Sequence, residues 1–238
     1  WLACACMVRT DDAAVEPEQR MVMLPASQVA IIDTWNVSGL RGTGSHDIAV
    51  KDALAPADCS YSISHGAPLQ PGPLYGFSLM GLLSVCLASV ALGLGRAALD
   101  EIKEMAPKKT PVGRRKPLSE WTVAQVALAE AEASLRAGRA FLFDAARDMW
   151  DVLEKGRQPS PQQRAIVRLS ASQAVRGAVR AVDIAYDFGG GSSIYETSRL
   201  QRQFRDIHTL TQHVMVGPSS MEAAGRVLLG LEVPPGFL

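Results

Sequence analysis

A long segment with a seven-residue apolar repeat, Ser119–Lys155, constrains the fold of this chain more than any other feature. A large apolar residue begins each repeat, and a small or β-branched residue follows three positions later. The two rows are Trp121, Leu128, Leu135, Leu142 and Met149, and Ala124, Ala131, Gly138, Ala145 and Val152. Such a seam requires a partner helix, and small residues let that helix approach closely. The segment predicts one long helix of a bundle, with Ser119 as its N-cap.

Further helices follow this one along the chain. Ser160-Pro161-Gln162-Gln163 fits a capping box with proline in the first turn, and Gly189 is a suitable end for the helix that it opens. The predicted apolar face of that helix consists of Ile166, Leu169, Val175, Val179, Val182 and Tyr186. Two more helices are expected at Ile194–Met215 and Pro218–Leu231. Short connections between successive helices indicate an antiparallel bundle.

The segment Leu74–Gly95 has no charged residue and passes a crude test for a membrane-spanning helix. It contains several serines and glycines, however, and lacks flanking aromatic residues or a strong charge asymmetry. A helix that is buried on all sides in a large bundle has the same composition. Because helices also follow this segment, we expect a buried core helix and no membrane span.

The first part of the chain has the pattern of β-strands. Strands are expected at Trp1–Val8, Arg20–Leu24, Val29–Val37 and Asp47–Leu54, with a turn at Asp11–Gln19. Prolines and glycines after residue 60 indicate a linker. The predicted organisation is therefore α+β: a β-region at 1–60, a linker at 61–73 and a helical bundle at 74–238. Because the chain begins at Trp1 inside an apolar run, we expect it to be a fragment whose exposed edge at Trp1–Val8 would favour aggregation.

Composition argues against several classes of protein. The formal net charge is zero, which disfavours nucleic-acid binding over the whole surface. The four cysteines form no CxxC pair and only four histidines are present, so neither a zinc site nor a disulfide framework is expected. No basic, apolar leader of a secretory signal is visible. We expect a cytoplasmic protein with reduced thiols and no metal.

Two glycine-rich segments could hold a ligand. Arg41-Gly42-Thr43-Gly44-Ser45-His46 could hold a phosphate through its backbone and the arginine, although a simple turn explains the glycines at least as well. Gly189-Gly190-Gly191-Ser192-Ser193 leads into the next helix and could bind an anion, or merely connect two helices. A basic loop between helices is expected to be solvated, and contact with nucleic acid or with a cofactor phosphate are the alternatives; its charged members are Lys108, Lys109, Arg114, Arg115 and Lys116.

The predicted helix Ile194–Met215 carries a polar stripe. Arg202 and Asp206 are spaced to form an ion pair, which a solvated helix face would also show. His208 and His213 extend the polar character toward an apolar end of the helix. Histidine titrates near neutral pH and can act as an acid or a base, so His213 is a candidate catalytic residue.

Taken in order, W-x-x-x-G-L-R-G-T-G-S-H-D, the heptad helix, YDFGGGSSIY and R-x-x-R-D-I-H-x-x-x-Q-H resemble the acyl-CoA dehydrogenase superfamily. The chain is most similar to the flavin-dependent monooxygenase branch, the oxygenase components of two-component hydroxylases. The resemblance covers nearly the whole chain. It implies the second half of a middle β-domain followed by the complete C-terminal helical bundle.

The resemblance also implies roles for individual residues. The dehydrogenases of the superfamily carry a catalytic glutamate after the Arg-Asp pair, whereas Ile207–Val216 contains none and Glu196 lies before that pair. His213 would instead assist formation or protonation of a flavin C4a-hydroperoxide, or deprotonate a phenolic substrate, with His208 as the second candidate. Flavin contacts are expected from Gly189, Gly190, Gly191, Arg114 and Arg115, and Arg41, Thr43 and Ser45 are expected at the wall of the active site.

The resulting hypothesis is an oxygenase component that uses reduced flavin, FMN or FAD, and oxygen to hydroxylate a small organic substrate. A separate flavin reductase and a homodimer or homotetramer are the implied partners. Two alternatives stay open: an FAD-containing acyl-CoA dehydrogenase with a displaced base, and a helical assembly module without catalysis, which the heptad seam supports equally well.

Overall fold

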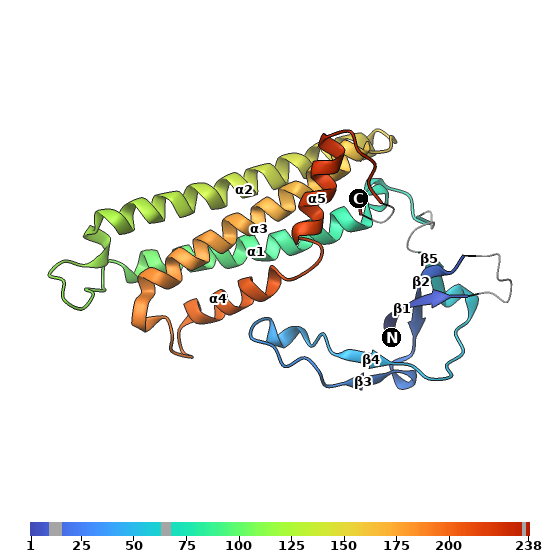
Figure 1. The fold of residues 1–238 in the computed structure, drawn as a ribbon, viewed down its shortest axis with the longest axis horizontal. Coiled ribbons are helices and arrows are strands. Elements are labelled where there is room, and N and C mark those ends of the chain that lie inside the picture. Colours follow the sequence, from blue (N-terminus) through green and yellow to red (C-terminus); the bar gives the residue numbers. More distant parts are fainter. Residues whose placement is uncertain (10–15, 63–67, 235–236) are drawn as a thin grey trace. The chain divides into compact units, whose positions relative to one another are not determined.

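The structure, a computed structural model, describes residues 1–9, 16–62, 68–234 and 237–238 (Figure 1). The chain forms two compact units, and each is described by itself. One unit comprises residues 1–37 and 41–71, and the other comprises residues 38–40 and 72–238. The first contains all the described strands and the second contains all the described α-helices.

The first unit holds two small antiparallel sheets. In the larger sheet β2 (Glu18–Leu24) lies between β1 (Leu2–Val8) and β5 (Ser60–Ser62). In the smaller sheet β3 (Ala30–Ile32) pairs with β4 (Asp47–Ala49). Buried residues from β1, β2 and the segment before β3 form a small core, Cys4, Leu24 and Val29.

The strand predictions are correct in place but not in length for β3 and β4. Beyond Ile32 and before Asp47 the backbone pairs with side chains. The N–H of Asp47 donates to Thr34 Oγ1 at 2.9 Å, and the N–H of Trp35 donates to His46 Nδ1 at 3.2 Å. These side-chain acceptors compete with the ladder beyond Ile32 and end β3 there, whereas β4 ends at Ala49, which pairs with Ala30, the first residue of β3.

The predicted turn and linker differ from the structure in their extent. Tyr61 and Ser62, assigned to the linker, belong to β5 and pair with β2. Residues 63–67 of the predicted linker lie outside the described residues, as does much of the predicted turn Asp11–Gln19, whose described part reaches β2.

The second unit is a bundle of five α-helices with α3 at its centre (Figure 1). Its helices are α1 (Leu79–Met105), α2 (Thr122–Glu154), α3 (Pro161–Gly189), α4 (Arg199–Leu210) and α5 (Pro218–Leu228). The central helix contacts each of the other four. The α+β architecture predicted from the sequence is therefore confirmed.

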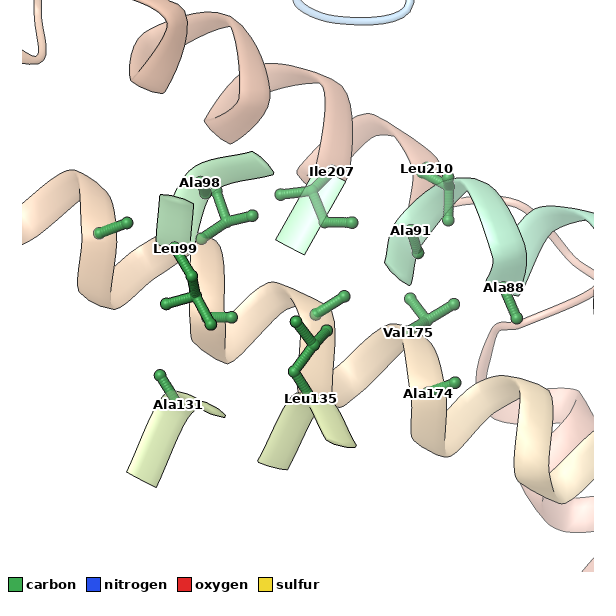
Figure 2. Close-up of a cluster of buried hydrophobic side chains, with 14 of the residues drawn as sticks. Ala88, Ala91, Ala98, Leu99, Ala131, Leu135, Ala174, Val175, Ile207 and Leu210 are labelled. Carbon is green, nitrogen blue, oxygen red and sulfur yellow. The ribbon is translucent and has the colours of Figure 1, made fainter. Parts of the chain in front are cut away.

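Helix α3 can have four neighbours because its buried surface consists mainly of small residues. They include Ala165, Ala171, Ala174, Ala178, Ala181 and Ala185. Larger side chains come mainly from the helices around it: Figure 2 shows Leu99 of α1 and Leu135 of α2 in the same cluster as Ile207 and Leu210 of α4. The apolar face predicted for α3 is only partly correct, since Val175 and Val182 are buried while the rest of that face is half-buried.

The predicted seam of α2 is confirmed. Its residues Leu135, Leu142 and Met149 are buried, as are Gly138 and Ala145 of the small row. A Cβ at Gly138 would lie 2.9 Å from Ala174 Cα, and a Cβ at Gly177 would lie 2.8 Å from Ser134 O. Both distances are too short for a real side chain, so these glycines let α2 and α3 approach backbone to backbone.

The N-terminus of α2 is not where the sequence predicted it. Ser119 lies in a 3-10 turn, Leu118–Glu120, and Trp121 is the N-cap without a side-chain cap bond. The N–H of Trp121 donates to Leu118 O at 3.1 Å, which completes that turn and delays the α-helix. The capping box predicted for α3 is present: Ser160 and Gln163 bond each other's backbone, and Pro161 is in the first turn.

Helix α1 is long and apolar enough to cross a membrane by length and composition alone. It begins at Leu79 with Ser78 as N-cap, later than predicted. One face packs into the bundle through Ser84, Ala88, Ala91 and other small residues. The other face leaves Leu83 and Val90 exposed, so the prediction of a core helix is correct for one face and the prediction of burial on all sides is wrong.

Candidate functional site

His213 lies in a turn between α4 and α5, and not within α4 as predicted. The N–H of His213 donates to Leu210 O and its own carbonyl accepts from the N–H of Val216, both at 3.1 Å. These bonds form successive turns where the helix would otherwise continue. The predicted helix Ile194–Met215 is therefore shorter at both ends, and Pro218 already belongs to α5, which ends at Leu228.

The imidazole of His213 is exposed and is held by its own turn. Its Nδ1 accepts a hydrogen bond from the N–H of Met215 at 3.2 Å. A nitrogen that accepts carries no proton in the neutral ring, so the proton is on Nε2. The arrangement presents one nitrogen to the backbone and leaves the other for a proton transfer.

His208 has a different environment on α4. Its Nε2 lies 2.8 Å from Asp183 Oδ1 of α3. Its ring contacts Phe204 with centroids 4.4 Å apart, and Phe204 stacks on Tyr186 with centroids 4.5 Å apart. His208 thus links α4 to α3, and its Nε2 is already paired with Asp183.

The Arg-Asp pair of the sequence motif, Arg205-Asp206, has a structural explanation in this unit. The carboxylate of Asp206 accepts the N–H of Leu40 at 2.6 Å, and Ser38 Oγ lies 3.3 Å from Thr209 Oγ1. A Cβ at Gly39 would collide with the backbone carbonyl of Arg205. The predicted pair of Asp206 with Arg202 is not formed in the described part of the chain.

The glycine segment after α3 forms a short 3-10 helix, Gly190–Ser192, and not a direct lead into α4, which begins at Arg199. Gly189 is the last residue of α3, as predicted, and Gly190 follows with φ +50°. Lys109 Nζ donates to the carbonyl of Gly189 and lies 3.3 Å from Ser192 Oγ. Burial lowers the pKa of Lys109 from its ordinary value.

A surface pocket of about 960 Å³ adjoins this segment. Its lining includes Lys109, Trp121, Gly190, Gly191 and Tyr195, together with acidic side chains from α1 and α3. Space is open around Gly191, where an added Cβ would meet nothing within 4 Å. Lys109, glycine backbone and a serine hydroxyl form a small polar cradle that suits an anionic group.

The two arginines predicted to contact flavin, Arg114 and Arg115, lie near Trp121, which lines this pocket. The guanidinium of Arg114 lies 4.6 Å from the centroid of the Trp121 ring. Arg114, Arg115 and Trp121 line a second pocket of about 480 Å³. Trp121 belongs to the lining of both pockets, so the arginines and the glycine segment border neighbouring pockets of the bundle.

Arg41, Thr43 and Ser45 lie on an exposed turn, and Arg41–Thr43 form a 3-10 helix. Gly44 has φ +58°, which fits the interpretation of this segment as a turn, while Gly42 has an ordinary φ. These residues belong to the first unit and His213 belongs to the second. Their place at an active-site wall stays a prediction.

The structure brings some predicted residues together and separates others. The glycine segment precedes α4 and His213 follows it, and twelve residues of helix at about 1.5 Å each separate these positions by about 18 Å. Sequence reasoning missed Asp183 and the role of Lys109, which appeared only as one residue of a basic loop. It also missed Arg168, although a charged residue between Val167 and Leu169 of an apolar helix was a usable signal.

The described residues contain no group of three or more histidine, cysteine and acidic side chains that could hold a metal ion. Cys4, Cys6, Cys59 and Cys86 are all free thiols.

Comparison with known proteins identifies the bundle. Residues 85–218 match the family described as "Acyl-CoA dehydrogenase, C-terminal domain". The indole-3-acetate monooxygenase of Pseudomonas putida is 33% identical over 219 residues, which cover 92% of this chain and 56% of that protein. The oxygenase component of the FADH(2)-dependent resorcinol hydroxylase of a Rhizobium species is 29% identical over 98% of this chain and 61% of that protein.

Solved structures agree with this relationship. XiaF from a Streptomyces species, in complex with FADH2 and glycerol, superposes with a TM-score of 0.84 and 26% identity over 94% of this chain and 59% of that one. The 3-HSA hydroxylase from Rhodococcus has the same fold, with a TM-score of 0.88 and 23% identity over 99% of this chain and 62% of that one. The predicted fold class is confirmed. This chain spans about 56–61% of the length of the two curated relatives.

Proposed function

Because this chain belongs to the acyl-CoA dehydrogenase C-terminal domain family, with flavin-dependent monooxygenases among its relatives, we propose that it is the catalytic bundle of a two-component monooxygenase. The proposed reaction consumes a substrate RH, oxygen and reduced flavin, and yields ROH, water and oxidised flavin. One oxygen atom enters the substrate and the other leaves as water. Flavin, when bound, supplies the electrons and activates the oxygen.

His213 is the observation that carries this proposal. It is an exposed imidazole whose Nδ1 is occupied by the Met215 N–H, and its Nε2 has no partner in the described residues. A proton carrier at neutral pH is what oxygen transfer requires from the protein, because the departing oxygen must be protonated to leave as water. We assign this role to His213 and keep His208 as the second candidate.

An acyl-CoA dehydrogenase is the less favoured alternative. Such an enzyme removes a proton from carbon and needs a carboxylate or a comparable base in its site. The turn after α4, Thr211–Gly217, contains no acidic residue, and Asp206 is committed to the N–H of Leu40. The relatives named above are a monooxygenase and a hydroxylase component, which favours oxygenation over dehydrogenation.

The residues at the end of α3 suit a flavin phosphate. Lys109 supplies a cation and Ser192 supplies a hydroxyl. Gly190 and Gly191 have no side chains that would keep a ligand from their backbone. We propose that these residues, with Arg114 and Arg115, hold FMN or FAD. About 18 Å of helix separates them from His213 along α4, and we propose that a flavin held here serves His213 of a second copy in a homo-oligomer.

The proposed partners are a flavin reductase, a second copy of the chain and a small organic substrate. The resorcinol hydroxylase relative is named as an oxygenase component, a term that implies a separate source of reduced flavin. The exposed apolar residues Leu83 and Val90 of α1 suit a helix of a second copy. We place the protein in the cytoplasm, where a reductase can supply reduced flavin, and propose neither a nucleic-acid nor a membrane partner.

The test uses the complete protein, chemically reduced FMN or FAD, and indole-3-acetate or resorcinol as the probe substrate. Oxygen is added under stopped flow, and hydroxylated product and hydrogen peroxide are quantified. His213→Asn is expected to lower the rate of product formation on the order of a hundredfold and to divert oxygen into hydrogen peroxide.

His208→Asn tests the second candidate, whose imidazole is already paired with Asp183. A small effect of His208→Asn and a large effect of His213→Asn support the assignment. Unchanged product formation in His213→Asn refutes it. Failure of the unmodified protein to hydroxylate any probe while reducing FAD with acyl-CoA would favour the dehydrogenase, and indifference to flavin would favour an assembly module.

A further inference from the structure

A buried polar cluster is joined by hydrogen bonds to the turn that carries His213. Its side chains are Arg168 of α3, Ser220 of α5 and Ser84 of α1. Arg168 is 3% exposed and both serines are fully buried. Polar groups at such depth are costly unless they are paired, so their partners indicate what the cluster is for.

The bonds of the cluster converge on one backbone carbonyl. Arg168 Nη2 donates to Ser220 Oγ at 2.5 Å, and Ser220 Oγ donates to the carbonyl of Met215 at 2.9 Å. Ser84 Oγ also lies 2.9 Å from that carbonyl, as well as 2.7 Å from Met80 O of its own helix. Ser220 of α5 thus bonds the Met215 carbonyl directly, Arg168 of α3 bonds Ser220, and the hydroxyl of Ser84 on α1 has Met80 O and Met215 O as alternative acceptors.

Arg168 is an unusual member for a cluster of this kind. In the described ranges no carboxylate forms an ion pair with it, and its other contact is with the carbonyl of Phe237. Burial lowers the pKa of Arg168 from its ordinary value. A buried cation without a counter-ion contributes little to stability by itself, because desolvation opposes it. The presence of Arg168 is better explained by the side chain that it orients, Ser220.

The connection to His213 runs through Met215. The carbonyl of Met215 is fixed by the cluster, while its N–H donates to His213 Nδ1. Val216, the next residue, is buried in the main core. Because the cluster holds the Met215 carbonyl and the core holds Val216, the Met215 N–H keeps one orientation. The ring of His213, which accepts from that N–H, is oriented by it.

We propose that Arg168, Ser220 and Ser84 are positioning residues that hold Met215 so that the His213 imidazole keeps one orientation with its proton on Nε2. The inference rests on the proposed function of His213 for its effect on the reaction, but the orientation of the ring can be tested without turnover. The reason is pre-organisation: a ring that is already oriented loses no rate to a search for the productive rotamer and tautomer.

The kinetic test is a double-mutant cycle in the complete protein with reduced FMN or FAD and indole-3-acetate as the probe. Ser220→Ala is expected to lower product formation about tenfold in the wild-type background, since one hydrogen bond to a charged group is lost. In the His213→Asn background the same change should have almost no further effect, because the ring that it positions is absent.

Ser172→Ala is the matched control. Ser172 is an equally buried serine of α3, but its Oγ has no hydrogen-bond partner in the described structure. This variant should keep the wild-type rate. Ser220→Thr retains a hydroxyl and should restore most of the activity lost in Ser220→Ala. Equal losses from Ser220→Ala in both backgrounds, or no loss in either, would overturn the proposal.

A second measurement needs no flavin and separates this inference from the proposed function. Side-chain ¹⁵N shifts of the protein labelled only at histidine report the tautomer of His213, which His213→Asn identifies by the loss of its signals. Wild type and Ser172→Ala should show a protonated Nε2 and an unprotonated Nδ1, and Ser220→Ala should show a mixture. An unchanged tautomer in Ser220→Ala overturns the inference, whereas the expected change without hydroxylation of any probe refutes only the proposed function.

Discussion

The carboxylate of Asp206 accepts the backbone N–H of Leu40 at 2.6 Å, although the two residues are far apart in the sequence. Leu40 has φ +52°, a conformation that costs energy for a residue with a side chain. Gly39 packs directly on the backbone of α4 at Arg205. The bond therefore holds a strained, closely packed turn on the helix that leads to His213.

Removing this acceptor should destabilise the turn. Asp206→Ala is expected to lower the free energy of unfolding by about 1–3 kcal/mol, because a partly buried donor loses a charged partner. Urea denaturation measures the difference. Asp206→Asn keeps an oxygen at the same place and should lose less than the alanine variant. Equal stability of Asp206→Ala and wild type would show that the bond contributes nothing.

The sequence revealed the same Asp206 but not its partner. An i,i+4 spacing suggested Arg202, whereas the carboxylate reaches a backbone donor that is distant in the sequence. Contacts of that kind follow from tertiary packing and leave no periodic signal. The seam of α2 and the capping box at Ser160 were predictable because each depends only on local spacing.

The position of His213 shows the limit of the same reasoning at the candidate site. Its residues Thr211–Met215 have a pattern compatible with a helix, but the turn is fixed by bonds from Ser84 and Ser220 on other helices to Met215. The α3 face was likewise predicted from its large residues, whereas alanine, serine and glycine make up most of its buried residues. The turn at His213 and the small-residue face of α3 both depend on tertiary packing, which the residue spacing within one segment does not predict.

The contact of α2 with α3 requires glycine at Gly177. An added Cβ would lie 2.8 Å from Ser134 O, and a backbone atom cannot move aside as a side chain can. Gly177→Ala is expected to lower the free energy of unfolding by about 1–3 kcal/mol. The midpoint of thermal unfolding should fall by several degrees, which calorimetry measures.

Gly93 of α1 provides the control for this prediction. A Cβ at Gly93 would meet nothing within 4 Å, so only helix propensity changes on substitution. Gly93→Ala is expected to raise stability by up to about 1 kcal/mol. Equal effects of the two substitutions would contradict the packing argument.

Glu132 of α2 should make the stability of the bundle depend on pH. Arg96 donates to both of its oxygens, at 2.9 and 2.7 Å, and Arg136 donates at 2.7 Å. These bonds, that from Arg96 first, hold the pKa of Glu132 well below its ordinary value. A lowered carboxyl pKa stabilises the folded state fully above pH 4.5, and this stabilisation is lost as the pH falls toward the lowered value.

Glu132→Gln should therefore lower the thermal midpoint at pH 7 by a few degrees, corresponding to about 1 kcal/mol for a surface network. The difference from wild type should shrink as the pH falls below 4.5. Glu130→Gln is the control, because among the described residues Glu130 forms an ion pair only with Arg180 and both side chains are more than half exposed. A difference for Glu132→Gln that stays constant with pH would show that the carboxylate charge is not responsible.

Lys109 should determine how tightly the end of α3 binds the phosphate of a flavin. Its Nζ bonds Gly189 and lies beside Ser192, and it is partly buried at the edge of the pocket. Lys109→Met removes the charge while keeping the length of the side chain. We expect the Kd for reduced or oxidised flavin to rise about tenfold, which corresponds to the loss of one charge-assisted hydrogen bond.

Fluorescence titration of the complete protein with FMN and with FAD measures this change. Lys108→Met is the matched control, because Lys108 lies next in the chain but pairs with the exposed Glu104. The control should bind flavin with the affinity of wild type. A similar rise in Kd for both variants would indicate a general effect of net charge, because long-range attraction does not distinguish neighbouring lysines. If the Kd rises in neither variant, the flavin phosphate binds elsewhere. Lys109 then serves only to anchor the glycine segment to the loop that follows α1.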